Sequence, residues 1–168
     1  MFELKTKRLR LIPLDYDNLM LLKESRADME HNLGLNNSEL NFSGEYRDTR
    51  AEAFEFWLEN AHNDSSDYRW HTNWEVVHTK KNRSIGGASF LGEPNKKGEV
   101  ILGYIIDKDF RNKGYMTEAV SAISDWALQH GGAKRVISFI EHNSKDSKAV
   151  NKLLKKCGFK KEVRYVKQ

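Results

Sequence analysis

The unbroken apolar run Val100–Ile106 is the feature that most constrains the fold of this chain. Such a short run, rich in β-branched residues, is typical of a central β-strand that is covered on both faces. Apolar residues then recur at helical spacing over Thr117–Gln129, and a short apolar strand is predicted at Arg135–Ile140. A last apolar stripe predicts a helix that Gly158 ends. Strands that alternate with helices in this way predict an α/β protein with a mixed sheet and helices on both faces.

The elements in the first half of the chain are predicted from the same two patterns, apolar residues at helical spacing for helices and alternating apolar residues for strands. The stretch Asn36–Arg47 is polar and irregular, and the capping-box pattern from Thr49 to Glu52 then starts a helix that ends near Asn63. The other predicted elements are a strand at Arg8–Ile12, a helix at Asp15–Ser25, strands at Tyr68–His78, Ser84–Leu91 and Glu99–Asp107, and a final strand at Phe159–Val166.

Length and composition place the chain among single-domain globular proteins. Its 168 residues, 39% of them apolar, suit one domain over residues 1–168, and no repeat or linker divides it. The single cysteine, Cys157, excludes an internal disulfide framework, which fits a cytoplasmic protein. No apolar run is long enough for a membrane span, and the first residues lack the pattern of a signal peptide. We therefore expect no membrane association.

The positive charge of the chain is concentrated near its C-terminal end. There are 28 Lys and Arg against 24 Asp and Glu, a net charge of +4, and eight lysines lie in Lys145–Lys167. Such a cluster is usually a solvated helix face, and it also attracts anionic ligands such as nucleotide cofactors. Aromatic residues are not interleaved with it, which disfavours a nucleic-acid-binding protein. The scattered histidines and the one cysteine show no metal-ligand spacing.

The loop between the apolar strand and the next helix carries the first chemical signal. Asp107 ends the strand and is expected to position the backbone, and a helix begins near Gly114. The first N–H groups of a helix have no internal partner and attract anions. Gly114 allows a phosphate to approach the backbone closely, and Arg111 and Lys113 add positive charge. The loop is either an anion site or an ordinary turn from strand to helix.

Three segments of the sequence together resemble the GNAT superfamily of N-acetyltransferases. The central one runs from Gly103 through the loop Phe110-Arg111-Asn112-Lys113-Gly114-Tyr115-Met116 into Thr117-Glu118-Ala119. Thr6–Leu11 resembles the first strand of that family, and Leu153–Phe159 resembles the end of its last helix. The likeness is greatest to the branch that contains the ribosomal-protein alanine N-acetyltransferases.

The resemblance implies a fold and a cofactor. The fold is a mostly antiparallel sheet, splayed around the cofactor site, with helices on both faces. Acetyl-coenzyme A, the acyl donor, would place its pyrophosphate on the backbone of Arg111, Asn112, Lys113, Gly114, Tyr115 and Met116, next to Thr117. Its pantetheine would pair with the edge of Ile105, Ile106 and Asp107, where that strand separates from Arg135–Ile140. A primary amine, at a protein N-terminus or on a small molecule, would then attack the thioester directly, and backbone N–H groups near Ile105 would stabilise the oxyanion.

The sequence departs from the family pattern at three places. Met116 replaces a Gly or Ala, so its side chain is expected to point away from the phosphates. In the last helix, Ser147 and Leu154 stand where the family has Asn and Tyr; an alternative register with an insertion uses Asn143 instead. The group that protonates the leaving thiolate is therefore Ser147 or water. A strand that usually follows in the family has no counterpart before Gln168, and a partner subunit in a homodimer or an open sheet edge is expected in its place.

Glu99 is the candidate general base. It precedes the apolar strand and matches a family position that often bears Glu, although a charged residue in solvent at a strand end is the alternative. Trp70 and Trp74 are expected either in the core or in the amine pocket. Cys157 lies on an apolar helix stripe and is expected to pack there. The competing function is a non-catalytic module that binds acyl-coenzyme A, because the last helix lacks the usual acid.

Overall fold

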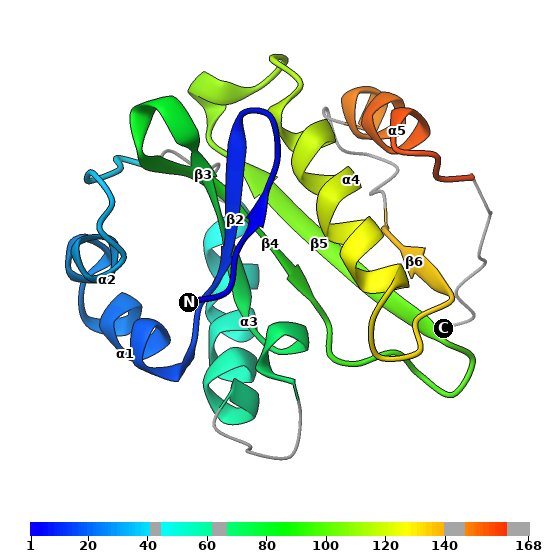
Figure 1. The fold of residues 1–168 in the computed structure, drawn as a ribbon, viewed down its shortest axis with the longest axis horizontal. Coiled ribbons are helices and arrows are strands. Elements are labelled where there is room, and N and C mark those ends of the chain that lie inside the picture. The colour runs from blue at the N-terminus through cyan, green and yellow to red at the C-terminus, as the bar shows by residue number, and fades with distance from the viewer. Residues whose placement is uncertain (41–44, 62–66, 140–146, 161–168) are drawn as a thin grey trace.

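A computed structural model describes residues 1–40, 45–61, 67–139 and 147–160 of the chain (Figure 1). No helix in these ranges combines the length and the apolar character that crossing a membrane requires. The strands and helices are, in chain order, β1 (Leu4–Lys5), β2 (Leu9–Pro13), α1 (Tyr16–Glu24), α2 (Arg26–Asn32), α3 (Glu45–Ala61), β3 (Asn73–His78), β4 (Arg83–Phe90), β5 (Glu99–Ile106), α4 (Tyr115–Leu128), β6 (Arg135–Ile137) and α5 (Ser147–Lys156).

The described strands form one sheet in the order β1-β2-β3-β4-β5-β6. Each neighbouring pair is antiparallel except β5 and β6, which are parallel. Strands β4 and β5 approach each other so closely that a Cβ atom on Gly86 would lie 2.3 Å from the backbone oxygen of Ile105. The predicted mixed and mostly antiparallel sheet is confirmed.

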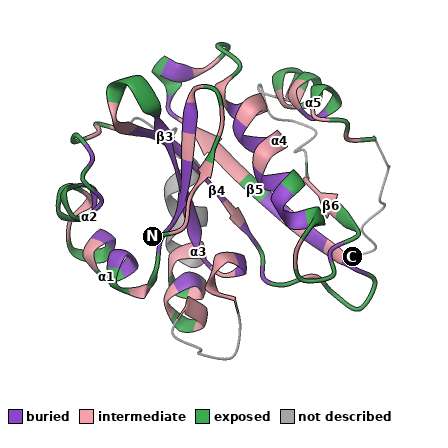
Figure 2. Cartoon of the chain, in the orientation of Figure 1, coloured by how far each residue is buried: buried purple, intermediate pink, exposed green. Residues whose placement is uncertain are grey.

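Helices cover both faces of the sheet, each over its own hydrophobic core. The face that carries α4 and α5 buries Leu11, Leu102 and Leu154 together with the apolar stripe of α4. The opposite face packs against α1, α2 and α3, and buries Ile12, Val77 and residues of those helices. Figure 1 shows α4 and α3 on opposite sides of the sheet, and Figure 2 shows that the buried residues of the helices lie on the sides that meet it. The periodicities in the sequence therefore predicted the layer arrangement correctly.

An aromatic cluster fills one end of the first core. The ring of Trp126 on α4 lies 4.7 Å from Trp70 and 4.9 Å from Trp74, measured between centroids. Phe90 joins them at 4.9 Å from Trp70. Trp70 and Trp74 are 1% and 0% exposed, so they pack in the core and the alternative of an amine pocket is wrong for them.

Several predicted boundaries differ from the structure. Tyr68–Trp70 is a 3₁₀ turn that the Asp67 side chain caps, and the strand predicted from Tyr68 begins only at Asn73. The helix predicted from Thr49 begins at Glu45, so Thr49 lies inside it. Periodicity misplaced these boundaries because caps and tertiary contacts set helix ends.

Two short elements were not predicted. Strand β1 has two residues and forms only because it pairs with β2. Helix α2 follows α1 without a loop: Ser25 is extended, with φ of −157°, and its hydroxyl accepts a hydrogen bond from the N–H of Asp28. The extended residue Ser25 ends the first helix and caps the second. The sequence around it is continuously polar and gave no signal of this break.

The sequence predicted that the apolar strand β5 is covered on both faces, and the structure does not confirm this. Among the described strands, β5 is followed only by β6, which ends the sheet. Val100 and Leu102 are buried, whereas Gly103 is exposed and Ile105 is half-buried. The final strand predicted at Phe159–Val166 is wrong for its first two residues, which follow α5 as irregular chain, and its remaining residues lie outside the described ranges.

Candidate functional site

Strands β5 and β6 pair over only a short distance and then separate. Their register runs from Glu99 opposite Arg135 to Ile101 opposite Ile137. Beyond these pairs β5 continues to Ile106, whereas β6 has ended. Within the described residues, the last part of β5 therefore has an edge that no strand covers, and backbone groups at such an edge can pair with an extended ligand.

Asp107 organises the loop that follows β5. It is 2% exposed, its N–H donates to the Ile85 carbonyl at 2.9 Å, and its carboxylate accepts from the Asp109 N–H at 2.8 Å. The expectation that Asp107 positions backbone is confirmed. The chain then takes positive φ angles at Asn112 (60°) and Gly114 (76°), which Asn tolerates better than most residues and Gly adopts freely.

Helix α4 begins at Tyr115 with N–H groups that no side chain caps. Its N-cap is Gly114, which has no side chain to accept a hydrogen bond. A Cβ atom on Gly114 would meet one described atom within 4 Å outside its immediate chain neighbours, a guanidinium nitrogen of Arg8 at 3.5 Å. Met116 points into the core and is 5% exposed, as expected for a residue larger than Gly or Ala. The start of α4 therefore carries partial positive charge, and Gly114 in front of it has no side chain that would block an anion from approaching the backbone.

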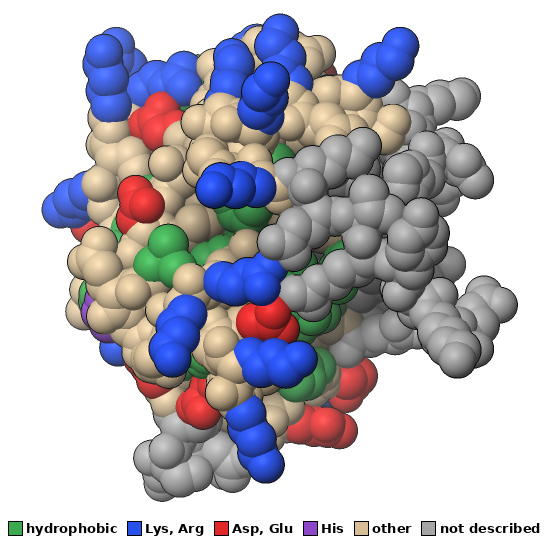
Figure 3. Space-filling model, turned by 90° about the vertical axis from the view of Figure 1, so that its right-hand side faces the viewer, with side chains coloured by type: hydrophobic (Ala, Val, Ile, Leu, Met, Phe, Trp, Pro, Cys, Tyr) green, Lys and Arg blue, Asp and Glu red, His purple; other side chains and the backbone are tan. Residues whose placement is uncertain are grey.

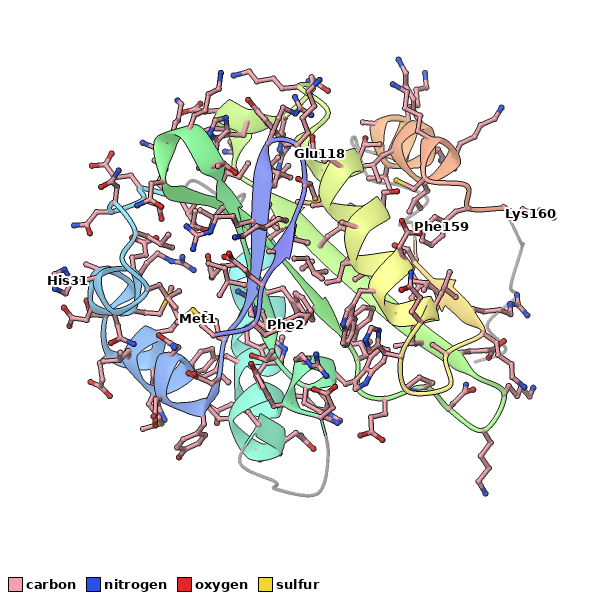
Figure 4. The ribbon with its side chains drawn as sticks, viewed as in Figure 1. Met1, Phe2, His31, Glu118, Phe159 and Lys160 are labelled. Atoms are coloured by element: carbon pink, nitrogen blue, oxygen red, sulfur yellow. The ribbon has the colours of Figure 1, made fainter. Side chains whose placement is uncertain are left out.

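The β1–β2 hairpin holds the first turn of α4 through a residue pair that the sequence analysis missed. The backbone N–H and the Nε of Arg8 each donate to the Glu118 carboxylate at 2.7 Å, and the Thr6 hydroxyl donates to it at 2.5 Å. Arg8 also donates through Nη1 to the Lys113 carbonyl at 3.0 Å. Figure 4 shows Glu118 beside the tip of this hairpin. Arg8 therefore neutralises a carboxylate close to the predicted anion site and fixes the loop.

His78 on β3 contacts Tyr115, the first residue of α4. Its hydroxyl lies 3.1 Å from Nε2 of His78, whose Nδ1 accepts from the Lys81 N–H at 3.2 Å. Burial lowers the pKa of His78, with nearby Lys81 and Arg8 adding to the effect, so the imidazole is neutral at neutral pH. Since Nδ1 accepts, the ring proton lies on Nε2 and is donated to the Tyr115 oxygen. The Arg8 guanidinium lies 4.4 Å from the centroid of the same tyrosine ring.

Basic side chains lie in this loop and on helix α5. Lys113 donates through Nζ to the Asp109 carbonyl at 2.6 Å. Helix α5 packs against α4, where the Cys157 thiol donates to the Thr117 carbonyl at 3.3 Å and burial raises the pKa of that thiol. The side of the molecule that carries α5 displays many Lys and Arg side chains (Figure 3). On α5 the lysines form an exposed face, which confirms the predicted solvated helix: Lys148, Lys152, Lys155 and Lys156.

The predicted base, Glu99, lies at the opposite end of β5 from the loop. Its carboxylate is 3.4 Å from Arg135 and accepts from the Asn95 amide at 3.3 Å. Glu99 and Ile105 are separated by roughly 20 Å of strand at about 3.3 Å per residue. The structure therefore does not bring Glu99 to the loop.

The predicted residues of the last helix are only partly described. Ser147 is the first residue of α5 and is half-buried, whereas Asn143 lies outside the described ranges. Leu154, at the family's Tyr position, is 6% exposed in the core. In the described part of the chain, no three His, Cys, Asp or Glu side chains come together as a group that could hold a metal ion.

The ion pair at the start of α4 makes a pH-dependent contribution to stability. Burial raises the pKa of Glu118, but hydrogen bonds from Thr6 and Arg8 outweigh it, and the net pKa is lowered. A carboxyl group with a lowered pKa stabilises the fold above its unfolded pKa, and this stabilisation is lost as pH falls through the folded pKa. We expect Glu118→Gln to lower the free energy of unfolding at neutral pH by about 1–3 kcal/mol.

Urea denaturation from about pH 7 down to about pH 3 measures this effect. The difference between wild type and Glu118→Gln is expected to shrink as pH falls below the ordinary Glu pKa of 4.5. Glu55→Gln, at an exposed position on α3, serves as the control and should show little difference at any pH. A Glu118→Gln effect that is independent of pH would show that the carboxylate charge does not stabilise this end of α4.

The sequence comparison places the chain in a family. The family model described as an acetyltransferase (GNAT) domain matches residues 8–160. The chain therefore belongs to the GNAT acetyltransferase family, and the predicted resemblance is confirmed. An uncharacterized N-acetyltransferase of Bacillus subtilis, YjdG, is 33% identical over 87 residues. That alignment covers 52% of this chain and 50% of YjdG, so the chain spans about half the length of its curated relative.

Two solved structures illustrate the likeness in fold. Ribosomal-protein-S5-alanine acetyltransferase from Vibrio fischeri is 19% identical, with a TM-score of 0.57 over 96% of this chain and 85% of that one. AAC(6')-Iy, in complex with the bisubstrate analog CoA-S-monomethyl-acetylneamine, is 16% identical, with a TM-score of 0.58 over 96% and 97% of the two chains. At these identities the likeness shows the fold, and it confirms the predicted arrangement of sheet and helices.

Proposed function

We propose that this chain transfers the acetyl group of acetyl-coenzyme A to a primary amine. The observation that carries the proposal is the start of α4 behind Gly114, which no side chain caps, in the loop that follows a strand whose last part no described strand covers. Membership of the GNAT family supports acetyl transfer as the reaction class. AAC(6')-Iy, which shares the fold, binds an analog that contains coenzyme A.

In this proposal the loop binds the pyrophosphate mainly through backbone groups. The first N–H groups of α4, which no side chain caps, are available behind Gly114, and Arg111 and Lys113 supply positive charge. The Lys113 amino group donates to the Asp109 carbonyl and lies 5.7 Å from the centroid of the Phe110 ring, at an exposed position from which it can turn toward a phosphate. Arg8 and His78 hold the loop without needing to contact the ligand themselves.

The edge of β5 binds the pantetheine arm. Ile105, Ile106 and Asp107 lie beyond the last residue pair with β6, so an extended chain fits beside them in the manner of an added strand. The thioester then lies near the middle of the sheet. The amine attacks its carbonyl carbon, and a backbone N–H group near Ile105 stabilises the oxyanion.

The proton of the substrate ammonium must be removed before attack. We propose Glu99 as the final acceptor at the end of a chain of water molecules, because its carboxylate lies six residues along β5 from Ile105, too far for one water molecule to connect them. On the side of the leaving thiolate, Ser147 or, in the alternative register, Asn143 contacts the coenzyme. A Glu99→Gln variant is included in the assay below, and an unchanged pH dependence of kcat in that variant removes Glu99 from the mechanism.

Thiol release from acetyl-coenzyme A tests the proposed function. The amine panel includes spermidine, peptides with N-terminal Ala or Ser, and an amino sugar. Cys157 is the single cysteine, so the protein itself contributes at most one thiol equivalent per chain. We expect amine-dependent thiol release well above that background, together with calorimetric binding of coenzyme A. No binding at about 1 mM coenzyme A contradicts the proposal.

A non-catalytic acyl-coenzyme A-binding module is the second candidate. It is favoured by the buried Leu154, which cannot donate a proton to the thiolate. The same assay separates the two functions. Binding without turnover on any amine supports the module, and turnover excludes it.

A further inference from the structure

Gly103 on β5 is an open position beside the proposed thioester site. It is exposed, and β5 pairs with β4 past this point without a bulge. A Cβ atom at this position would have room: outside the chain neighbours, the described atoms within 4 Å are the carbonyl oxygen and the hydroxyl of Ser89, both at 4.0 Å. Glycine inside a strand marks a bulge, a closely approaching backbone or a ligand. The first two reasons do not hold for Gly103, which leaves the third.

The two faces of β5 differ around this position. Val100, Leu102 and Tyr104 point into the core under α4, and Figure 1 shows α4 lying over this face of the strand. Gly103 and Ile105 alternate with these residues along the strand and therefore lie on the opposite face. A group that binds at the uncovered edge of β5 consequently finds space on the face of Gly103.

Three isoleucine side chains form the apolar surroundings of Gly103. Ile101 and Ile105 flank it on the same face of β5, and all three, with Ile137 on β6, are half-buried and lie in neither of the two described cores. Ile101 and Ile137 form the last residue pair between the two strands, so they close the uncovered edge at one end. This surface suits a hydrocarbon group, which would remove it from water.

The proposed course of the coenzyme brings its acyl group to Gly103. The pyrophosphate binds at the loop after Asp107, and the pantetheine runs back along β5 to Ile105. The acyl group is the last part of the donor, so it lies next along the strand, beside Gly103. From Gly103 to the closing pair at Ile101 is roughly 7 Å of strand. This length accommodates about four carbon–carbon bonds of about 1.5 Å, whereas an acetyl group has only one.

We propose that this chain also transfers short straight-chain acyl groups longer than acetyl, and that Gly103 provides the space for them. This inference rests on the proposed function and extends its donor to coenzyme A thioesters such as butyryl-coenzyme A. The bonds that change are the same. The amine nitrogen bonds to the carbonyl carbon, the carbon–sulfur bond breaks, and sulfur keeps the electron pair. The surplus proton of the amine goes to water, and coenzyme A leaves beside an N-acyl amide.

The wild-type chain gives the first test, with acetyl- and butyryl-coenzyme A and the fastest amine of the panel at saturation. Each methylene group that leaves water favours binding about 2- to 4-fold, which offsets the greater bulk of the longer chain. We expect kcat/KM for butyryl-coenzyme A to lie within about 10-fold of the acetyl value. A butyryl value below about one tenth of the acetyl value overturns the inference.

The variants Gly103→Ala and Gly103→Val fill the space in two steps. The measured quantity is the ratio of kcat/KM for butyryl- to acetyl-coenzyme A within each variant, so losses that affect both donors equally cancel. We expect the ratio to fall at least about 10-fold in Gly103→Val, because overpacking excludes the longer chain, and less in Gly103→Ala. The melting temperature should not fall, since Gly103 has no positive φ angle and strands favour valine.

Lys5→Val is the control, because it places the same side chain at an exposed strand position at the other edge of the sheet. Its ratio should equal that of the wild type. A Gly103→Val ratio that falls by less than about 10-fold overturns the role of Gly103. Should Gly103→Val not fold, Gly103→Ala decides, and an unchanged ratio there overturns that role. Turnover of acetyl-coenzyme A alone overturns the inference and leaves the proposed function standing, whereas no turnover with any donor refutes both.

Discussion

Gly114→Glu is expected to abolish coenzyme A binding, with a loss of affinity of about 100-fold or more. The new carboxylate lies in front of the first N–H groups of α4, where the pyrophosphate is proposed to bind. Two like charges about 4 Å apart repel by roughly 4 kcal/mol near a protein surface. Calorimetric titration with coenzyme A measures the effect. Wild-type affinity in Gly114→Glu removes the loop from the mechanism.

Gly114→Ala is the control for backbone strain. Gly114 has φ of 76°, so any side chain at this position costs roughly 1–2 kcal/mol. The alanine Cβ itself meets little, since the nearest described atom outside the neighbouring residues is an Arg8 nitrogen at 3.5 Å. Both variants should therefore lose similar stability, while only Gly114→Glu should lose most of its coenzyme A affinity. Equal losses of coenzyme A affinity in the two variants would show that backbone strain at position 114, and not the added charge, weakens binding.

Glu75→Ala is expected to produce the largest loss of stability, about 3–5 kcal/mol in the free energy of unfolding. Glu75 on β3 is 1% exposed, and its carboxylate accepts from Arg26 at 3.1 and 3.2 Å and from Asn73 at 2.8 Å. The Ser84 hydroxyl also donates to it. Removing the carboxylate leaves three donors without this acceptor in the second core, and Arg26 keeps only Glu30 as an ion-pair partner. Urea denaturation at neutral pH measures the loss.

A surface ion pair supplies the contrast. Glu3 bonds Arg10 at 2.8 Å and Lys5 at 3.0 Å at the edge of the sheet. These side chains keep 21% to 73% of their surface exposed, and pairs so open to solvent contribute less than about 1 kcal/mol, so Glu3→Ala should change stability little. The double variant of Glu75 and Arg26 should lose less than the sum of the two single losses, because each removes the same interaction. A Glu75→Ala loss as small as that of Glu3→Ala shows that the buried network does not hold α2 on the sheet.

Local sequence patterns predicted the elements that have a clean periodicity. The apolar stripe predicted a helix over Thr117–Gln129, and α4 covers Tyr115–Leu128. Patterns failed where one residue changes the backbone direction, as Ser25 does between α1 and α2. They also failed for Tyr68–Trp70, because its alternation resembles a strand while Asp67 caps it as a turn.

The sequence by itself predicted a turn with the features of an anion site after the apolar strand, and it identified the chain as a member of the GNAT acetyltransferases. The turn can be predicted locally, since Asp107, Gly114 and the start of α4 lie close together in the chain, and the family can be identified because its motifs occur in the expected order along the sequence. Only the tertiary structure showed that Arg8 holds Glu118, which is 110 residues away, and that His78 on β3 lies within hydrogen-bonding distance of the Tyr115 hydroxyl on α4. Such contacts depend on how strands pair and where they separate. Side-chain periodicity determines which face of a strand is buried, but it does not determine which strand lies next to it.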